Sequence, residues 1–370
     1  MNQATQFRRD LHQIPETSFT EFKTKEYVVS VLKTLHCEVI ELLETGAAAY
    51  FDAGKEATLA YRADMDALPI QEETGLDFAS RHPGRMHACG HDGHMAMLLG
   101  FAQELDQLDR EPWKNNILLI FQPSEETVGG AKPICDTGIF EKYNVKAIFG
   151  THLWPFIPAG AVASRCDEMM AHASEVTVTV KGKSTHCAKP DEGIDALAIG
   201  ADLLCRLYAM EKKIAPSQYR ILKFGNFHAG TVRNILPETA VLEGSYRSFQ
   251  DATFDWMIDQ TKQIMHQLEQ ETGCQILFDY TEGYPAVIND AHLFGKAQAL
   301  LPQLQVLDKP EMIAEDFAFY QRKIPGVFFF LGTGTGIALH NCHFNFDEQV
   351  LQEGIKTDLA LMNIDLEGRL

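Results

Sequence analysis

The sequence lacks the features that mark several special classes of protein. No stretch of the 370 residues reaches the ~18 consecutive apolar residues of a membrane span. The opening residues, MNQATQFRRDLHQIPE, contain no apolar segment of the kind that forms a secretory signal. Repeats, low-complexity runs and Pro/Gly-rich linkers are absent as well. We therefore expect a soluble cytoplasmic protein without membrane contact.

Basic residues are scarce relative to acidic ones. The chain has 32 Lys and Arg residues against 51 Asp and Glu residues, which gives a formal net charge of -19. Nucleic-acid phosphates and anionic lipids both attract basic surfaces, so this balance argues against either as a partner. The partner we expect is a small molecule, and the negative charge serves solubility.

Cysteines are present, but they are scattered without a regular spacing. No CxxC pair occurs, which argues against a redox protein that works through its thiols. Without a secretion signal the thiols are expected to be reduced, and most are expected to be small core residues. The eight are Cys37, Cys89, Cys135, Cys166, Cys187, Cys205, Cys274 and Cys342.

Short apolar runs alternate with helical patterns in the outer parts of the chain. Runs at 57–61, 116–121, 146–150 and 326–331 predict strands buried on both faces, as in an α/β sheet. Helical periodicity predicts helices over 95–108 and 347–364, and one over 7–35 that is broken near Pro15. The fold class indicated is α/β, with a mostly parallel central sheet flanked by helices.

The middle of the chain has a different pattern. The residues EVTVTVK at 175–181 alternate apolar and polar side chains, which indicates a half-exposed strand. A helix over 194–210, strands over 220–227 and 238–245, a helix over 252–271 and a strand over 274–280 follow. This β-α-β-β-α-β order predicts an inserted α+β ferredoxin-like domain at 174–283. Residues 1–173 and 284–370 would form the catalytic domain around it.

Five groups of metal-capable side chains follow predicted strands or precede predicted helices. They are RADMD at 62–66, HACGHDGH at 87–94, QPSEE at 122–126, GTH at 150–152 and LHNCH at 339–343. Ligands bind beyond the carboxyl ends of strands in open parallel sheets, so the groups are expected to converge. Taken alone, His152 is more often a satisfied core histidine, and Asp64 and Asp66 could be turn or cap residues. HACGHDGH, which combines a thiol, three imidazoles and a carboxylate, is harder to explain without a metal.

Such a set of side chains suits amide hydrolysis. The reaction needs an activated water, a polarised carbonyl and a group that moves a proton, and two divalent ions about 3.5–4 Å apart can provide the first two. The adjacent Glu125 and Glu126 suit a division of labour, in which one carboxylate binds metal and the other takes the proton. Zn, Mn, Co and Ni all accept this mixture of ligands.

At these motifs the sequence resembles the aminoacylase/carboxypeptidase superfamily of metal-dependent amidohydrolases. The most similar branch contains hippurate hydrolases, auxin-conjugate hydrolases and N-acetyldiaminopimelate deacetylases. The similar segments are RRDLHQIPE, YRADMDALPI, GRMHACGHDGH, FQPSEE, GTHLWP, VKGKSTHCAKP, GTVRNILPE, EGSYRSF, AEDF and LHNCHF, which run from residue 8 to residue 344. The resemblance covers nearly the whole chain.

The resemblance implies roles for individual residues. Two divalent metal ions would bind to the side chains of Cys89, His91, Glu126, His152 and His340. The thiolate of Cys89 would bridge the two ions, which would keep it deprotonated. Glu125 falls on the general base. Asp64 and Asp66 fall on an element associated with catalysis, where Asp66 would orient a ligand.

In relatives the inserted domain supplies substrate contacts, often across a dimer. His186 would help to polarise the substrate carbonyl, and Asn234 and Arg247 fall on positions that contact the substrate or its carboxylate. Relatives usually read GKGGHAAxPH where this chain reads GKSTHCAKPD, so bulkier side chains flank His186. The resemblance also implies a homodimer formed through the inserted domain.

The predicted activity is hydrolysis of the amide of a small N-acyl amino acid, with N-acetyl the first choice. LHQIPE and the HACGHDGH region are similar in particular to N-acetyldiaminopimelate deacetylase of lysine synthesis. The alternatives are a broad N-acyl or hippurate-type amidohydrolase and a dipeptidase or metallo-carboxypeptidase. A protein that binds metal or amino acids without catalysis is a more distant alternative, because every expected ligand and the base are present.

Overall fold

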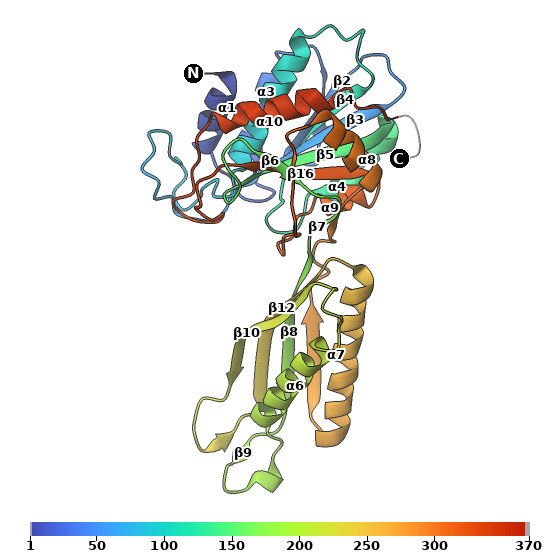
Figure 1. The fold of residues 1–370 in the computed structure, drawn as a ribbon. Helices are drawn as coiled ribbons and strands as arrows, with labels where there is room; N and C mark the ends of the chain where they lie inside the picture. Colours follow the sequence, from blue (N-terminus) through green and yellow to red (C-terminus); the bar gives the residue numbers. More distant parts are fainter. Residues whose placement is uncertain (1, 367–370) are drawn as a thin grey trace. The chain divides into compact units, whose positions relative to one another are not determined.

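The structure is a computed structural model that describes residues 2–366, and it divides the chain into two units, each with its own apolar core. The first unit comprises the chain up to Met169, Ile288–Pro310 and the chain from Asp316 onward. The inserted unit comprises Met170–Val287 together with Glu311–Glu315. Figure 1 draws both units, coloured along the sequence.

The first unit is built on an eight-stranded sheet with the order β1-β2-β4-β3-β5-β16-β6-β15. Its central strands β4, β3, β5 and β16 are parallel neighbours, whereas β1, β2 and the β16–β6 pair add antiparallel edges. The strands are β1 (Glu38–Leu42), β2 (Gly46–Phe51), β3 (Thr58–Asp64), β4 (Asn116–Gln122), β5 (Val145–Trp154), β6 (Val162–Ser164), β15 (Gln305–Val306) and β16 (Gly326–Gly332). The predicted α/β class with a largely parallel sheet is confirmed.

The apolar runs become strands because both faces of the sheet are covered. Every residue of β3, β4 and β16 is buried, as expected for parallel strands with helices on each side. Helix α3 packs on β3, β4 and β5, with α1 and α10 beside it (Figure 1). The helices of this unit are α1 (Gln3–His12), α2 (Phe22–Leu32), α3 (His91–Gln107), α4 (Ala131–Asp136), α5 (Ile139–Lys142), α8 (Ala291–Leu300), α9 (Ala318–Gln321) and α10 (Val350–Leu361).

At the start of the first unit one local prediction is confirmed and one element was missed. The pattern over 7–35 predicted a helix broken near Pro15, and the chain forms two helices, α1 and α2, with a non-helical segment around Pro15 between them. Proline cannot continue a helix and restricts the residue before it, so the first helix ends early. The β1–β2 hairpin was not predicted, because EVIEL carries two glutamates and GAAAYF is rich in alanine.

The inserted unit contains a four-stranded antiparallel sheet with the order β10-β12-β8-β13. Its main elements follow the chain order β8 (His172–Lys181), α6 (Ala196–Glu211), β10 (Arg220–Ala229), β12 (Thr239–Ser248), α7 (Asp251–Thr272) and β13 (Gln275–Tyr280). The two helices lie side by side on one face of the sheet (Figure 1). The side chains of Val176, Val178 and Val180 lie in the apolar core that the sheet forms with the two helices. This explains the alternation of apolar and polar residues in EVTVTVK.

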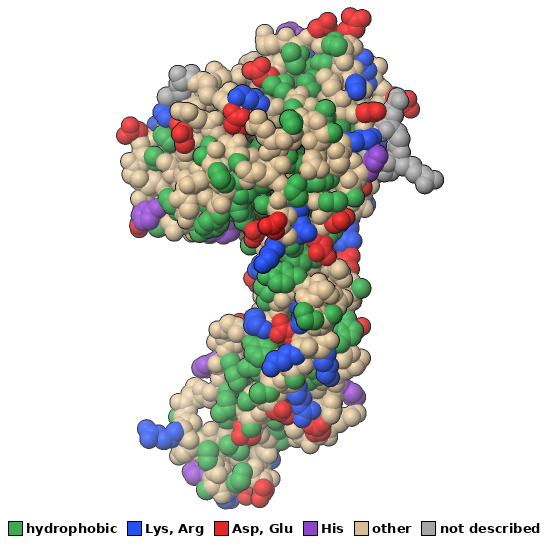
Figure 2. Space-filling model, in the orientation of Figure 1, with side chains coloured by type: hydrophobic (Ala, Val, Ile, Leu, Met, Phe, Trp, Pro, Cys, Tyr) green, Lys and Arg blue, Asp and Glu red, His purple; other side chains and the backbone are tan. Residues whose placement is uncertain are grey.

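The smaller elements lie in loops of the inserted unit and at the boundaries between the two units. A short pair of strands, β9 (Thr185–His186) and β11 (Ile235–Leu236), and a 3-10 turn, η1 (Pro190–Glu192), lie in the loops of the inserted unit. Strands β7 (Asp167–Met170) and β14 (Val287–Asn289) contain the unit boundaries. Within residues 2–366, no helix combines the length and the apolar character needed to cross a bilayer. Figure 2 shows acidic and basic side chains interspersed over the drawn face of both units.

Candidate metal centre

The carboxyl ends of the central parallel strands bring together the side chains singled out in the sequence. Asp64 is the last residue of β3, and Glu125 lies three residues after the end of β4. His91 is the first residue of α3, the helix that packs on these strands. His152 was expected just after a strand, but β5 continues to Trp154, so His152 lies inside it. His340 is carried by the loop that follows β16.

The five predicted metal ligands form one continuous cluster in the first unit. The ligand atoms of Cys89, His91 and Glu126 lie within 4.8 Å of one another. His91 Nε2 is 3.7 Å from Glu126 Oε1, and Cys89 Sγ is 3.5 Å from His152 Nε2. His340 Nε2 lies 3.2 Å from Glu126 Oε1. All but Glu126 and His340 are buried.

Main-chain carbonyls orient two of the histidines toward this cluster. His91 donates its Nδ1–H to the carbonyl of Asp66 at 2.8 Å, and His152 donates its Nδ1–H to the carbonyl of Leu153 at 2.8 Å. In the neutral ring each bond fixes the tautomer and leaves the Nε2 lone pair pointing into the cluster, which is how metal-binding histidines are usually held. His340 is held differently, because its own N–H donates to the carbonyl of Ala88 and its φ is 61°.

The glutamate loop is held through its main chain. The N–H groups of Glu125 and Glu126 donate to the two carboxylate oxygens of Asp66, at 2.9 and 3.0 Å. The N–H of Ser124 donates to Glu21 at 2.9 Å, and Ser124 itself has a φ of 59°. Three consecutive amides thus point at two buried carboxylates, so the main chain of the glutamate loop is held independently of its side chains.

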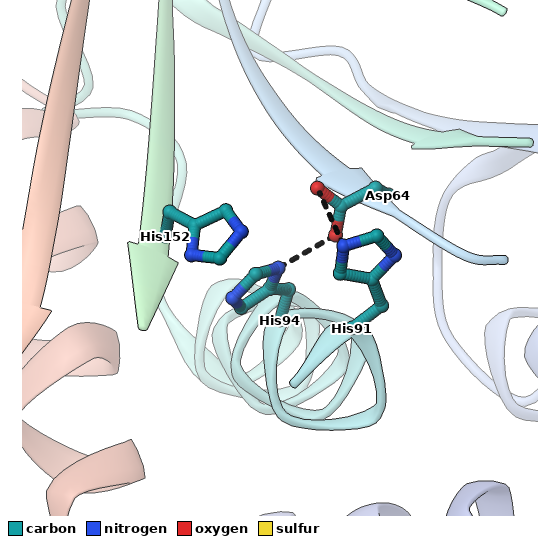
Figure 3. A group of neighbouring side chains, drawn as sticks. All are labelled: Asp64, His91, His94 and His152. Atoms are coloured by element: carbon teal, nitrogen blue, oxygen red, sulfur yellow. Dashed lines mark hydrogen bonds and ion pairs between the residues drawn. The ribbon is translucent and has the colours of Figure 1, made fainter. Parts of the chain in front are cut away.

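His94 is a member of this region whose role the sequence did not reveal. It donates its Nδ1–H to Asp64 at 2.6 Å, and its Nε2 accepts the N–H of Leu153 at 2.9 Å. Both ring nitrogens are therefore used, and His94 has no lone pair for a metal. Figure 3 shows it between Asp64 and His152, supporting β5 from α3. Asp64 also accepts a bond from Arg62 at 2.7 Å, so its carboxylate links the Arg62 guanidinium to the His94 ring.

The carboxylates of the cluster create a negative potential that favours the binding of cations. Burial, reinforced by the charges of Glu126 and Glu125, raises the pKa of the Cys89 thiol well above its ordinary value. Burial alone would lower the pKa of His91, but the carboxylates of Asp64, Asp66 and Glu126 raise it to about 10. Without metal, a proton on His91 offsets part of the negative charge. Divalent ions would offset it fully and would convert the thiol to a thiolate.

The geometry also fits a metal centre. Bonds of about 2.0–2.3 Å in a tetrahedral site hold neighbouring ligand atoms roughly 3.3–3.6 Å apart. The ligand-atom separations of 3.2, 3.5 and 3.7 Å in the cluster bracket that range. Among the residues that the structure describes, the buried Nε2 of His91 has no hydrogen-bond partner, which is costly unless an ion takes that place.

Comparison with known proteins agrees with this geometry. The model of the peptidase family M20/M25/M40 matches residues 60–363, which is most of the chain. The chain belongs to this family. The predicted resemblance is therefore confirmed, and the protein is a hydrolase of family M20.

Relatives of this M20 hydrolase match over almost their whole length. A protein of Oceanobacillus iheyensis named N-acetyldiaminopimelate deacetylase is 33% identical over 370 residues, covering 98% of this chain and 99% of its own. A protein of Leuconostoc citreum with the same name is 35% identical, covering 94% and 92%. A crystal structure from Bacillus subtilis, described as a dinuclear metal binding peptidase from the M20 family, has a TM-score of 0.87 at 32% identity and covers 99% and 98%.

The predicted substrate residues of this M20 hydrolase lie in the inserted unit, and only two of them are neighbours. His186 pairs with Ile235 between β9 and β11, and the N–H of Cys187 donates to the carbonyl of Asn234 at 3.0 Å. The N–H of Ala188 donates to His186 Nδ1 at 3.1 Å, so a neutral His186 carries its proton on the exposed Nε2.

Arg247 lies at the opposite end of the same unit. It is near the end of β12, whereas the loop with His186 adjoins the Thr239 end of that strand. Eight residues of strand separate Thr239 from Arg247, which is roughly 26 Å at about 3.3 Å per residue. The Arg247 guanidinium donates to Ser245 Oγ at 3.2 Å and to the carbonyl of Met312 in the segment Glu311–Glu315. Nothing in the local sequence indicates that this segment belongs to the inserted unit.

Proposed function

We propose that the protein removes the acyl group from a small N-acyl amino acid, and that N-acetyldiaminopimelate is the substrate to test first. The observation that carries this proposal is the pairing of a five-residue ligand cluster with an adjacent carboxylate, Glu125, on a loop fixed by Asp66. Relatives 33–35% identical over nearly the full chain bear the name N-acetyldiaminopimelate deacetylase. That activity would give the chain a role in lysine synthesis.

The cluster would hold two divalent ions of the Zn, Mn, Co or Ni type. When bound, the ions would polarise the amide carbonyl and lower the pKa of a water molecule. Cys89, His91, Glu126, His152 and His340 would serve as the ligands. All four ions accept this mixture of donors, so the metal that supports the highest turnover identifies the one that the site uses.

Glu125 would move the proton. Its main chain is fixed by Asp66, and its charge lies close enough to raise the pKa of the Cys89 thiol. It would take a proton from the attacking water and return it to the nitrogen of the leaving amino acid. Asp64, whose oxygens accept bonds from His94 and Arg62, would position the ligands instead of exchanging protons.

The inserted unit would act as a lid and a dimerisation domain, in line with the predicted ferredoxin-like insertion. Its strand order and two helices are compatible with that fold. His186 would donate from Nε2 to the oxyanion, Asn234 would support it, and Arg247 would bind the substrate carboxylate. Because roughly 26 Å of strand separates the His186 end from Arg247, one copy could not bring both to one small substrate. A homodimer would solve this, with His186 and Asn234 coming from the second copy.

The proposal is tested by comparing Glu125→Gln with Glu126→Gln. Glu125→Gln should retain two metal ions per chain and lose activity by at least about 100-fold, whereas Glu126→Gln should lose metal as well. Metal content is read by elemental analysis of the dialysed protein. Normal turnover by Glu125→Gln would overturn its assignment as the base.

A substrate panel separates the members of the class. N-acetyldiaminopimelate, other N-acetyl amino acids, N-benzoylglycine and dipeptides are assayed with each of the four metals. Preference for N-acetyldiaminopimelate supports the specific proposal, and equal rates on N-acetyl and N-benzoyl substrates would indicate a broad amidohydrolase. Preference for dipeptides would indicate a peptidase, and no hydrolysis in any arm would contradict catalysis.

A further inference from the structure

A second group of metal-capable side chains lies on the surface of the first unit, outside the cluster described above. It consists of Glu73, Cys342 and His343, whose ligand atoms all lie within 4.8 Å of one another. Glu73 Oε2 is 3.7 Å from Cys342 Sγ and 3.6 Å from His343 Nε2. Cys342 is half-buried, and the other two are exposed. None of these residues has a part in the proposed hydrolysis.

Main-chain bonds hold the two segments that carry these residues in register. The N–H of Glu73 donates to the carbonyl of Cys342 at 2.9 Å. In return, His343 donates its Nδ1–H to the carbonyl of Glu73 at 2.9 Å. The N–H of His343 also donates to the side chain of Asn341 at 2.9 Å. These reciprocal bonds fix the main chains of the two segments and the orientation of the His343 ring.

The His343 ring is oriented in the same way as His91 and His152. Its Nδ1–H is spent on a main-chain carbonyl, so the Nε2 lone pair faces Glu73 and Cys342. An ordinary surface ion pair needs no such arrangement, because it is weak and tolerates many side-chain geometries. A thiol beside the pair adds a donor that an ion pair does not use, and one that binds zinc strongly.

The two separations that involve Glu73 are close to those of ligands around one ion, and all three ligand atoms lie within 4.8 Å of one another. Tetrahedral bonds of about 2.0–2.3 Å from zinc to sulfur, nitrogen and oxygen hold the ligand atoms roughly 3.3–3.6 Å apart. The 3.6 and 3.7 Å distances to Glu73 Oε2 require only a small adjustment of exposed side chains. The fourth position is left for water. Binding would release the thiol proton of Cys342 to solvent, because the thiolate is the ligand.

We propose that Glu73, Cys342 and His343 form a third divalent-cation site, of a chemistry that favours Zn²⁺. Cys342 follows His340 by two residues, so an ion here would fasten the segment that carries His340 to the segment that carries Glu73. The site does not depend on catalysis, and it can fill or stay empty whatever the substrate of the enzyme is.

Site-resolved alkylation tests the proposal on the protein with its first two ions in place. The protein is treated with iodoacetamide with and without added Zn²⁺, and modification of each cysteine is followed by peptide mass spectrometry. Zinc should slow the modification of Cys342 by at least about tenfold, because a coordinated thiolate is a poor nucleophile. Cys205, an exposed cysteine on α6, should react at an unchanged rate.

His343→Gln is the decisive variant, and His292→Gln, at an exposed histidine of α8, is its matched control. His343→Gln should abolish the zinc protection of Cys342, and His292→Gln should leave it intact. Elemental analysis after dialysis against dilute zinc should give three ions per chain for the native protein and two for His343→Gln. Cys342→Ser provides a second variant with the same expected loss of one ion. Unprotected Cys342 in the native protein, or equal protection in His343→Gln, would overturn the site.

Discussion

The carboxylate of Asp66 accepts the main-chain N–H of Glu126 at 3.0 Å, while its other oxygen accepts the N–H of Glu125 at 2.9 Å. The main-chain carbonyl of the same aspartate orients His91. One residue thus sets the position of a proposed base and of two proposed ligands. The pKa of Asp66 is lowered because bonds from His91, Ser18 and Glu126 outweigh the effect of burial, which alone would raise it.

Replacement of Asp66 by Asn should reduce turnover strongly while the protein stays folded. An amide offers one acceptor oxygen, so its NH2 group would face one of the two N–H donors of the glutamate loop. Loss of such an orienting partner typically costs about 10–100-fold in activity or metal affinity. Steady-state rates and metal content of the purified variant measure both effects.

Ser18→Ala is the matched control for this change. It removes only the hydroxyl that donates to Asp66 at 2.7 Å and leaves the acceptors of the loop unchanged. Its activity should therefore stay within a few-fold of the native value, because Asp66 keeps both oxygens that accept the N–H groups of the glutamate loop. If Asp66→Asn were as active as Ser18→Ala, the orienting role of the carboxylate would be refuted.

Removal of metal should lower the thermal stability of the protein. Cys89, His91 and Glu126 are largely withdrawn from water, and ions that bind only the folded state stabilise it by mass action. At a free metal concentration of about 100 times the Kd this amounts to about 2.7 kcal/mol. For a unit of this size, the expected fall in Tm on chelation is roughly 5–10 °C.

Calorimetry of the chelated and the reloaded protein measures this shift. Glu126→Gln provides the control, because a site with a missing ligand should respond weakly to added metal. An identical Tm for the chelated and loaded native protein would argue against a buried metal centre.

The convergence of the site residues could be predicted from the sequence, but the contacts of the residues that support them could not. Asp64, Glu125 and His152 follow or end apolar runs that become neighbouring parallel strands, so their convergence follows from the order of the strands. Neither Glu21, whose carboxylate holds Ser124 from about a hundred positions away, nor the bonds of His94 could be inferred. Such contacts depend on tertiary packing, which local periodicity does not encode.

The exact boundaries of the inserted unit also depend on tertiary contacts that local sequence patterns do not encode. The alternation in EVTVTVK and the two amphipathic helices mark the elements, because each buries one face in a local core. The return of Glu311–Glu315 to this unit involves main-chain carbonyls instead, because Met312 accepts a bond from Arg247 and Ile313 accepts one from the N–H of Ala171. A carbonyl is common to every residue, so no sequence pattern distinguishes these two.

Asp358→Asn should stabilise the protein at alkaline pH relative to acidic pH. Asp358 is buried in α10, and burial raises its pKa to about 8. In the unfolded chain the pKa is about 3.9. Between these values the folded state binds more protons than the unfolded state, so the contribution of this group to stability falls as pH rises from about 4 to 8. Asparagine does not titrate, so the Tm of the variant relative to the native protein should rise over this range.

Thermal denaturation at about pH 5 and about pH 8 measures this difference. Glu104→Gln, at an exposed carboxylate of α3, should leave the pH dependence unchanged. A constant Tm difference between Asp358→Asn and the native protein at the two pH values would show that the carboxyl group is not protonated in the fold.

His12→Gln should destabilise the protein most at neutral and acidic pH. His12 is buried and donates its Nδ1–H to Asp92 at 2.8 Å, while its Nε2 lies 3.3 Å from Glu72. Burial alone would lower the pKa of His12, but the Asp92 and Glu72 carboxylates raise it to about 9. The imidazolium thus joins α1 to the start of α3, where Arg8 also binds Asp92. Loss of a buried charge-assisted bond should cost about 1–3 kcal/mol.

The pH dependence distinguishes this charged role from simple packing. A folded pKa of about 9 against about 6.5 in the unfolded chain gives stability that is fully present below about pH 6.5 and is lost as pH rises to about 9. Unfolding curves of His12→Gln should therefore approach those of the native protein above about pH 9. His36→Gln, which removes an exposed histidine 3.1 Å from Asp106, should cost less than about 1 kcal/mol at any pH. A His12→Gln deficit that stays constant from neutral to alkaline pH would mean that His12 is uncharged in the fold.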